Sequence, residues 1–183
     1  MVFSSYIFLF CFLPLFLLFY FCMPQRRRVF VLTAFSYVFY AWWNWRFAPL
    51  LLLSTTVDYL CGLFLPRLRS PNNRKALLCL SIGTNLALLG FFKYFMFAAK
   101  TGSDIFDALG LPFPSDLLLL KIVLPVGISF YTFQGMSYTI DIYRGIARPT
   151  KSFLDFACYI VMFPQLIAGP IVRYTHMENQ LHE

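Results

Sequence analysis

The sequence predicts an all-α fold, a polytopic transmembrane helical bundle with about six membrane segments. Apolar residues make up 60% of the 183 residues and charged residues only 13%, whereas soluble domains carry roughly a quarter charged residues. The apolar residues form long runs, and most basic residues gather between those runs. A soluble chain of this length could not hide so much apolar surface, because it still exposes a large fraction of its area.

The first two apolar runs, 3–23 and 29–45, approach the roughly 20 residues that cross a bilayer. The first run has no basic residue before it and arginines after it, so it is interpreted as a retained helix and not as a signal peptide. Pro14 is expected to bend this helix. The second run ends in "YAWWNW", and because Trp and Tyr favour the bilayer interface, this cluster predicts the outer membrane surface.

The third segment, 48–65, is expected to cross the membrane back to the inner side, and the fourth, 76–99, to cross to the outer side again. Ten of the fifteen basic residues lie in three short stretches between apolar runs: Arg26, Arg27, Arg28, Arg67, Arg69, Arg74, Lys75, Arg144, Arg148 and Lys151. The positive-inside rule assigns these stretches to the cytoplasm and the N-terminus to the opposite side. The net charge of +7 therefore reports topology and contact with anionic lipid, and no nucleic-acid partner is predicted.

The remaining segments follow the one clear break in hydrophobicity, "KTGSDIFDALGLPFPSD" (100–116), which is interpreted as an outer loop. Segment 117–143 then runs inward, and segment 153–172 is the last. No soluble domain, repeat or linker is evident, so residues 1–183 are expected to form a single membrane domain.

Polar residues inside these runs are costly in lipid, by about 2.5–3.5 kcal/mol for a central charge, and therefore tend to face protein or trapped water. Asp58 lies in the middle of the third segment and Asn85 in the fourth. Two interpretations are open for Asp58, a packing hydrogen bond between helices or the lining of a polar cavity. For Asn85 the packing interpretation is favoured.

Broken or kinked helices are expected near 124–145 and 163–174. Pro125 removes a backbone donor from the first of these stretches, and Gln134 lies on one helical face with Tyr131. The first stretch is interpreted either as the wall of a cavity or as a kinked core helix. Backbone left unpaired at membrane depth is tolerated only where protein or enclosed water satisfies it.

The second stretch, "FPQLIAGPIVRY", contains two prolines that bracket Gln165 and Gly169. Gly169 has no side chain, so another backbone or a ligand can approach it closely. Arg173 supplies a permanent cation suited to a phosphate, a carboxylate or a structural aspartate, or it serves as a topological anchor.

Neither a metal site nor a disulfide framework is expected. The five cysteines lie in apolar segments without a C-x-x-C pair, which is typical of small buried hydrophobes. The two histidines, His176 and His182, lie in the polar tail without the i, i+4 spacing that puts two metal ligands on one helix face.

Residues 124–145 and 163–174, together with "FSSYIFLFCFLPL" and "YAWWNW", resemble membrane-bound O-acyltransferases. Within that superfamily they are similar to the bacterial alginate O-acetyltransferase branch, over essentially the whole chain. The resemblance implies a multi-pass enzyme of the bacterial inner membrane, with a periplasmic N-terminus and a funnel through the bilayer. An acyl group from a cytoplasmic donor, acetyl-CoA or another acyl carrier, would pass to an exported polysaccharide such as alginate, with help from periplasmic acetylation proteins.

In this family the catalytic histidine lies downstream of the "GP" motif, so the resemblance implies the amino-terminal portion of an enzyme that is inactive alone. No catalytic role is assigned to a residue of this chain. Tyr131, Gln134, Gln165 and Arg173 are the candidates for lining the cavity or positioning the donor. The alternative is a non-catalytic membrane scaffold or interaction protein derived from a truncated transferase. A small transporter has little support, because no pair of repeats accompanies the broken helices.

Overall fold

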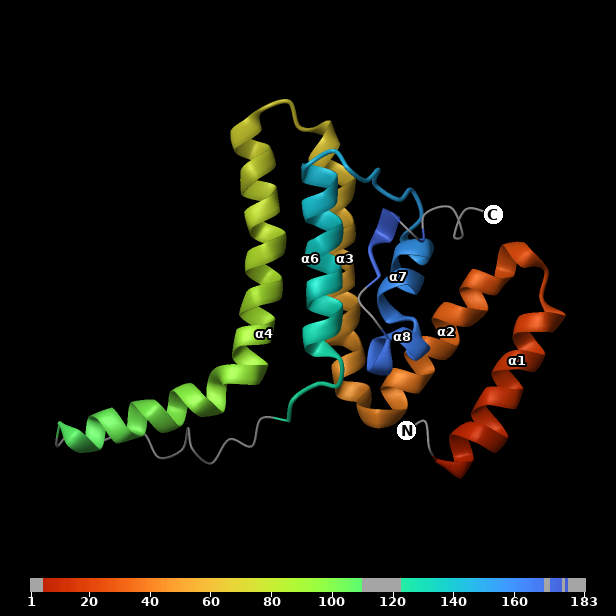
Figure 1. The fold of residues 1–183 in the computed structure, drawn as a ribbon, viewed down its shortest axis with the longest axis horizontal. Helices are drawn as coiled ribbons and strands as arrows, with labels where there is room; N and C mark the ends of the chain where they lie inside the picture. Colours follow the sequence, from red (N-terminus) through yellow and green to blue (C-terminus); the bar gives the residue numbers. More distant parts are fainter. Residues whose placement is uncertain (1–4, 110–122, 170–171, 176, 178–183) are drawn as a thin grey trace.

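The computed structural model describes residues 5–109, 123–169, 172–175 and 177, and all of the regular secondary structure in these residues is helical. In chain order the elements are η1 (Phe8–Phe12), α1 (Leu13–Cys22), α2 (Gln25–Asn44), η2 (Trp45–Phe47), α3 (Ala48–Phe64), η3 (Leu65–Arg67), α4 (Pro71–Ala108), α6 (Ile128–Tyr143), α7 (Phe153–Val161) and α8 (Phe163–Ala168). Figure 1 shows α3, α4 and α6 side by side, with α7 and α8 between this group and α2.

Two stretches of the described chain are long and apolar enough to cross a membrane, Arg27–Arg67 and Pro71–Phe95. The first includes both α2 and α3, which turn back on each other at η2 (Figure 1). At this turn the Asn44 side chain accepts a hydrogen bond from the Arg46 backbone N–H at 3.1 Å. Length and composition thus identify two candidate membrane-crossing stretches, and the count of six membrane segments stays a prediction.

The first predicted segment becomes two elements, because the chain forms a π-helical turn, η1, directly before Pro14 in α1. A wider turn accommodates a residue that cannot donate to the helix ladder. The structure therefore shows a π turn over the residues before Pro14, and the bend expected at Pro14 stays a prediction. At the end of α1, Arg28 Nε donates to the Met23 carbonyl at 3.3 Å, and its guanidinium lies 5.4 Å from the centre of the Tyr20 ring.

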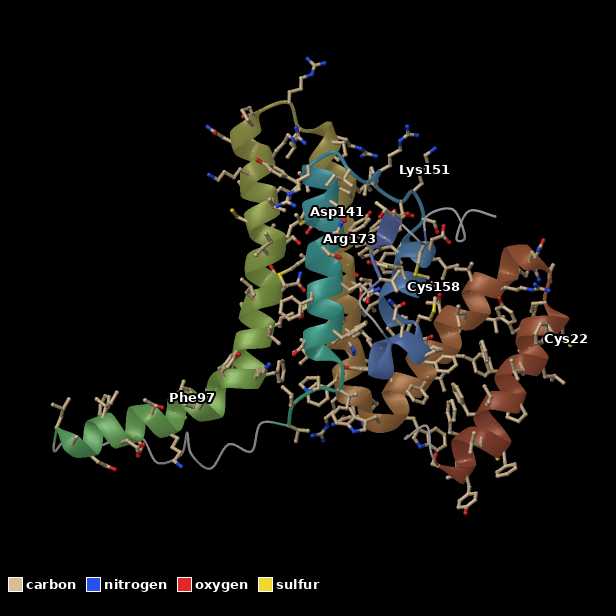
Figure 2. The ribbon with its side chains drawn as sticks, in the orientation of Figure 1. Cys22, Phe97, Asp141, Lys151, Cys158 and Arg173 are labelled. Carbon is tan, nitrogen blue, oxygen red and sulfur yellow. The ribbon has the colours of Figure 1, made fainter. Side chains whose placement is uncertain are left out.

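Helix α4 is longer than predicted, since it begins at Pro71 and continues to Ala108, whereas the sequence predicts a helix over 76–99 and a loop from Lys100. The loop is predicted because residues 100–108 are polar. These residues include several that are compatible with a helix and only one glycine, so the helix continues through them. After the part that packs on α6, the helix bends and its last turns, with Phe97, run away from the bundle (Figures 1 and 2).

The breaks predicted near 124–145 and 163–174 are both found. In the described part of segment 117–143, residues 123–127 form a turn around Pro125 and α6 begins at Ile128; residues 117–122 lie outside the described residues. The break therefore precedes α6, which runs without interruption to Tyr143. The described part of segment 153–172 forms two short helices, α7 and α8, which is a break of the kind predicted near 163–174.

A buried polar network joins α3, α4 and α6. Asp58 Oδ1 accepts hydrogen bonds from Ser81 Oγ and from Asn85 Nδ2, both at 2.7 Å. Ser81 Oγ also lies 3.1 Å from Thr139 Oγ1 on α6. A Cβ atom built on Gly135 would collide with Asp58 Oδ2, so the missing side chain is what lets α6 come this close. These contacts support the packing interpretation of Asp58 and of Asn85.

A cluster of aromatic rings packs α8 against η1, α1 and α2. The ring of Phe163, the first residue of α8, lies 5.3–6.2 Å from the rings of Phe8, Phe12, Phe16 and Phe39. All four pairs have edge-to-face or tilted geometry, which aromatic quadrupoles prefer over face-to-face stacking. The start of α8 is thereby held against α1 and α2.

Candidate functional site

The candidate site is built around the break between α7 and α8. Helix α7 ends at Val161, Met162 leaves the helical conformation with φ −47° and ψ 111°, and α8 begins at Phe163. Pro164 follows in the first turn of α8, where its missing N–H costs nothing. In a continuous helix Pro164 would remove a hydrogen bond and clash with the preceding turn, so the chain breaks here instead.

Two side chains from other helices replace the hydrogen bond lost at this break. In a continuous helix the Phe163 N–H would donate to the Tyr159 carbonyl. Here Gln134 Nε2 donates to the Tyr159 carbonyl oxygen at 2.8 Å, and the Phe163 N–H donates to Ser36 Oγ at 3.2 Å. Ser36 in turn donates to the Leu32 carbonyl in α2 at 2.7 Å. The broken pair is therefore satisfied by α6 on one side and α2 on the other.

Gln134 is fully buried, and only one end of its amide is engaged in this way. Its Oε1 accepts no hydrogen bond from the described residues. The amide lies beside the Tyr159 hydroxyl, which donates to the Val172 carbonyl at 2.8 Å. A buried acceptor without a donor is uncommon and calls for an explanation. That Gln134 lines a substrate path stays a prediction.

Tyr131 lies one turn before Gln134 on the same face of α6 and is also buried. Its hydroxyl neighbours that of Tyr40 on α2. Farther along this face, Asp141 is buried, and its Oδ2 has no hydrogen-bond partner among the described residues. Tyr131, Gln134 and Asp141 therefore mark a polar stripe along one face of α6.

The two sequence motifs meet in space at Gly127 and Leu166. Gly127 caps the start of α6 with φ 73°, a left-handed conformation that residues with side chains rarely adopt. A Cβ atom there would lie 2.9 Å from the Leu166 carbonyl oxygen of α8. The stretch 124–145 and the stretch 163–174 thus contact each other directly, as well as through α7.

Gln165 is buried in α8, and its carbonyl accepts a hydrogen bond from the Gly169 N–H at 3.0 Å. A Cβ atom on Gly169 would lie only 2.7 Å from Gln165 Cα. The close contact at Gly169 is with the preceding turn of α8 itself, so the approach of another backbone or a ligand there stays a prediction.

Arg173 is the one candidate that the structure places at the surface of the described residues. Its side chain is exposed and forms no hydrogen bond or ion pair with them. The next residue, Tyr174, is buried, with its ring centre 5.0 Å from that of Tyr138 and 5.4 Å from that of Tyr159. Figure 2 labels Arg173 beside the α6–α7 side of the bundle. The structure therefore groups Tyr131, Gln134 and Gln165 in the interior and leaves Arg173 outside.

Sequence reasoning missed Ser36, Tyr159 and Asp141. Pro164 shows that an N–H and a carbonyl must find new partners, but it does not show which residues supply them. The signal for Asp141 was available, since it is an acidic residue in an apolar segment. Among the described residues, no group of three or more His, Cys, Asp or Glu side chains could hold a metal ion.

These features define a helical protein with two candidate membrane-crossing stretches and a polar, proline-broken interior. The chain is 42% identical to the probable alginate O-acetylase AlgI of Pseudomonas putida and 41% identical to that of Azotobacter vinelandii, over its whole length in both cases. It is 31% identical to a peptidoglycan O-acetyltransferase of Helicobacter pylori, again over its whole length. The chain is thus related throughout to O-acetyltransferases, which confirms the resemblance to the alginate O-acetyltransferase branch of the membrane-bound O-acyltransferases.

The chain spans 37%, 36% and 39% of the lengths of these three relatives, respectively. No family model matches it, and no solved structure is significantly similar to it.

Proposed function

We propose that this chain forms the part of a bacterial O-acetyltransferase that builds the intramembrane approach to the transfer centre. The acetyl group would pass to an exported polysaccharide such as alginate. The observation that carries the proposal is the identity of 42% with an alginate O-acetylase along the entire chain. The contact between the two motif stretches at the α7–α8 break supports it, because function in membrane proteins concentrates where polar groups and irregular backbone are buried.

In the proposed topology the chain crosses the bacterial inner membrane about six times, with a periplasmic N-terminus. The α3–α4 and α6–α7 connections lie at the same end of the bundle, with Lys151 at that end (Figures 1 and 2). Both connections carry basic residues, which supports a cytoplasmic location for that end.

In this proposal Tyr131, Gln134 and Gln165 line the path of the acyl group. The free acceptor of Gln134 suits a donor group on a passing ligand, since a buried carbonyl oxygen gains from each hydrogen bond it accepts. Arg173, exposed and unpaired within the described residues, suits a phosphate or carboxylate of the acyl donor, acetyl-CoA or another acyl carrier. Periplasmic acetylation proteins would act on the acceptor side.

Residues 1–183 are proposed to have no transfer activity by themselves. Acyl transfer to a hydroxyl needs a general base, most often histidine, and the two histidines of the sequence, His176 and His182, both lie in its polar C-terminal tail. The base would come from a histidine-bearing region like that of the family.

The test uses a strain that makes alginate and lacks its native O-acetylase. It would receive either this chain alone or this chain joined to the remaining portion of the Pseudomonas putida relative, and O-acetyl groups on the polymer would be measured by NMR. Acetylation with the joined protein and none with the chain alone is the expected result. Acetylation by the chain alone would overturn the claim of inactivity, and none with a stably produced joined protein would overturn the substrate assignment. Co-purification with periplasmic acetylation proteins without transfer would favour the scaffold alternative.

A matched pair of substitutions tests the role of Arg173. Within the joined protein, Arg173→Gln is expected to lower acetylation, whereas Arg69→Gln removes the same charge from an exposed connection and is expected to leave it unchanged. Equal effects would show that Arg173 acts only as one more basic residue of the surface.

A further inference from the structure

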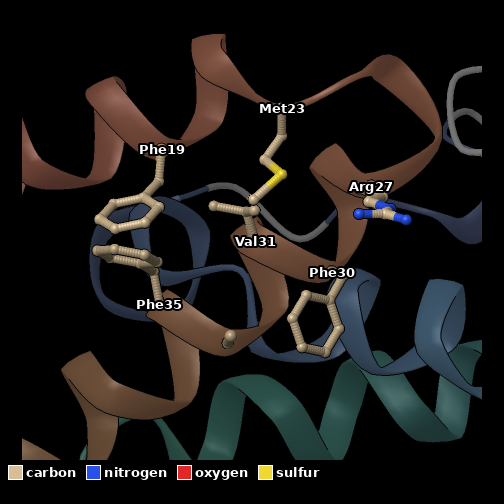
Figure 3. Close-up of a pocket in the computed structure, with 7 residues that line it drawn as sticks. Phe19, Met23, Arg27, Phe30, Val31 and Phe35 are labelled. Carbon is tan, nitrogen blue, oxygen red and sulfur yellow. The ribbon is translucent and has the colours of Figure 1, made fainter.

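A groove of about 480 Å³ lies between α1 and α2, within the range of about 300–1,000 Å³ typical of sites for small organic molecules. Its lining is formed by Phe19, Met23, Arg27, Phe30, Val31, Ala34 and Phe35. Figure 3 shows the apolar side chains along the groove and Arg27 at one end. The groove therefore combines an apolar wall with one permanent cation.

The guanidinium of Arg27 is available to a ligand. The side chain is exposed and makes no hydrogen bond or ion pair with the described residues. Its neighbour Arg28 differs, since its Nε donates to the Met23 carbonyl and its guanidinium lies over the Tyr20 ring. One arginine thus closes the α1–α2 turn and the other is free to bind an anion at the groove.

The position of Arg27 along the chain fits a lipid headgroup. The apolar run of α2 begins at Val29, directly after Arg26, Arg27 and Arg28, so in a membrane this guanidinium lies where apolar chain gives way to headgroups. Basic residues at that level attract anionic lipids, and a guanidinium binds a phosphate through two parallel hydrogen bonds.

We propose that this groove is a binding site for an anionic phospholipid, with the phosphate on Arg27 and one acyl chain along Phe19, Phe30 and Phe35. A second groove between the same helices provides an internal comparison. It measures about 410 Å³, is lined by residues that include Cys11, Leu15 and Trp42, and has no charged residue in its lining. It offers the same apolar contact without a partner for the phosphate.

The test uses the full chain in vesicles of phosphatidylcholine that contain a phosphatidylglycerol with a photoactivatable acyl chain. Labelled peptides are mapped by mass spectrometry, and binding is titrated for the chain and for variants. Arg27→Gln is expected to weaken phosphatidylglycerol binding about fivefold, the effect of one basic residue near an anionic surface, and to remove labelling of the groove at Met23 and Phe30. Arg27→Lys keeps the charge and should keep most of the binding.

Arg69→Gln is the matched control, since Arg69 is an exposed basic residue outside the groove. It should leave groove labelling unchanged, and labelling at Cys11 and Leu15 should not respond to Arg27→Gln. The proposal is overturned if Arg27→Gln and Arg69→Gln behave alike, because the attraction would then be general. It is also overturned if a photoactivatable phosphatidylcholine labels the groove equally well, or if free inorganic phosphate displaces the lipid.

Discussion

The substitution Gln134→Leu tests whether the α7–α8 break depends on the hydrogen bond from α6. Leucine has a similar volume and leaves the Tyr159 carbonyl oxygen buried without its donor. An unsatisfied buried polar group costs about 1–3 kcal/mol, whereas measured interhelical hydrogen bonds in membranes average only about 0.6 kcal/mol. The substitution also removes the unpaired Oε1, which offsets part of the loss. We therefore expect the free energy of unfolding to fall by about 1 kcal/mol.

The assay is reversible unfolding in mixed micelles at increasing denaturing detergent, followed by circular dichroism. Thr84→Ala is the matched control, because the Thr84 hydroxyl donates only to the Leu80 carbonyl of its own helix, and its loss should change stability by a few tenths of a kcal/mol. If Gln134→Leu is as stable as this control, then the hydrogen bond to Tyr159 does not stabilise the break.

A double-mutant cycle that combines Gln134→Leu with Ser36→Ala tests whether the two hydrogen bonds at the break are coupled. Each single substitution frees one half of the pair formed by the Tyr159 carbonyl and the Phe163 N–H. With both partners gone, these two groups can bond each other, so the double variant should lose less than the sum of the single losses. Strict additivity would mean that the two sites do not share this pair.

Three further substitutions test the packing of the bundle by the same unfolding assay. Gly135→Ala should destabilise the protein by about 1–3 kcal/mol, because the added Cβ collides with Asp58. The control Gly90→Ala has open space around it and should stabilise the protein by up to about 1 kcal/mol. An unchanged stability of Gly135→Ala would contradict the close approach of α3 and α6. Phe163→Ala should cost about 3 kcal/mol through loss of the aromatic cluster, and a loss below about 1 kcal/mol would show that α8 is held elsewhere. Gly127→Ala should destabilise by about 1–2 kcal/mol because φ is 73°, and unchanged stability would refute the left-handed turn before α6.

The sequence predicted where the helices break, but not which side chains meet at the breaks. Pro125 and Pro164 predicted two interruptions, and both occur, one before α6 and one between α7 and α8. The sequence could not show that Gln134 donates to Tyr159, because the two residues lie 25 positions apart on different helices. For the same reason Asp58 had two open interpretations until Ser81 and Asn85 were seen to bind it.

The sequence by itself determined the apolar segments, the basic connections between them and the points where the helices must break, since hydropathy and proline geometry act locally along the chain. Helix length was decided less locally, as α4 continues through the polar stretch that follows Lys100. Only the tertiary structure decided which buried donors and acceptors meet. A broken backbone pair can be satisfied by any polar side chain within reach, and packing alone brought Gln134 and Ser36 to the break at Pro164.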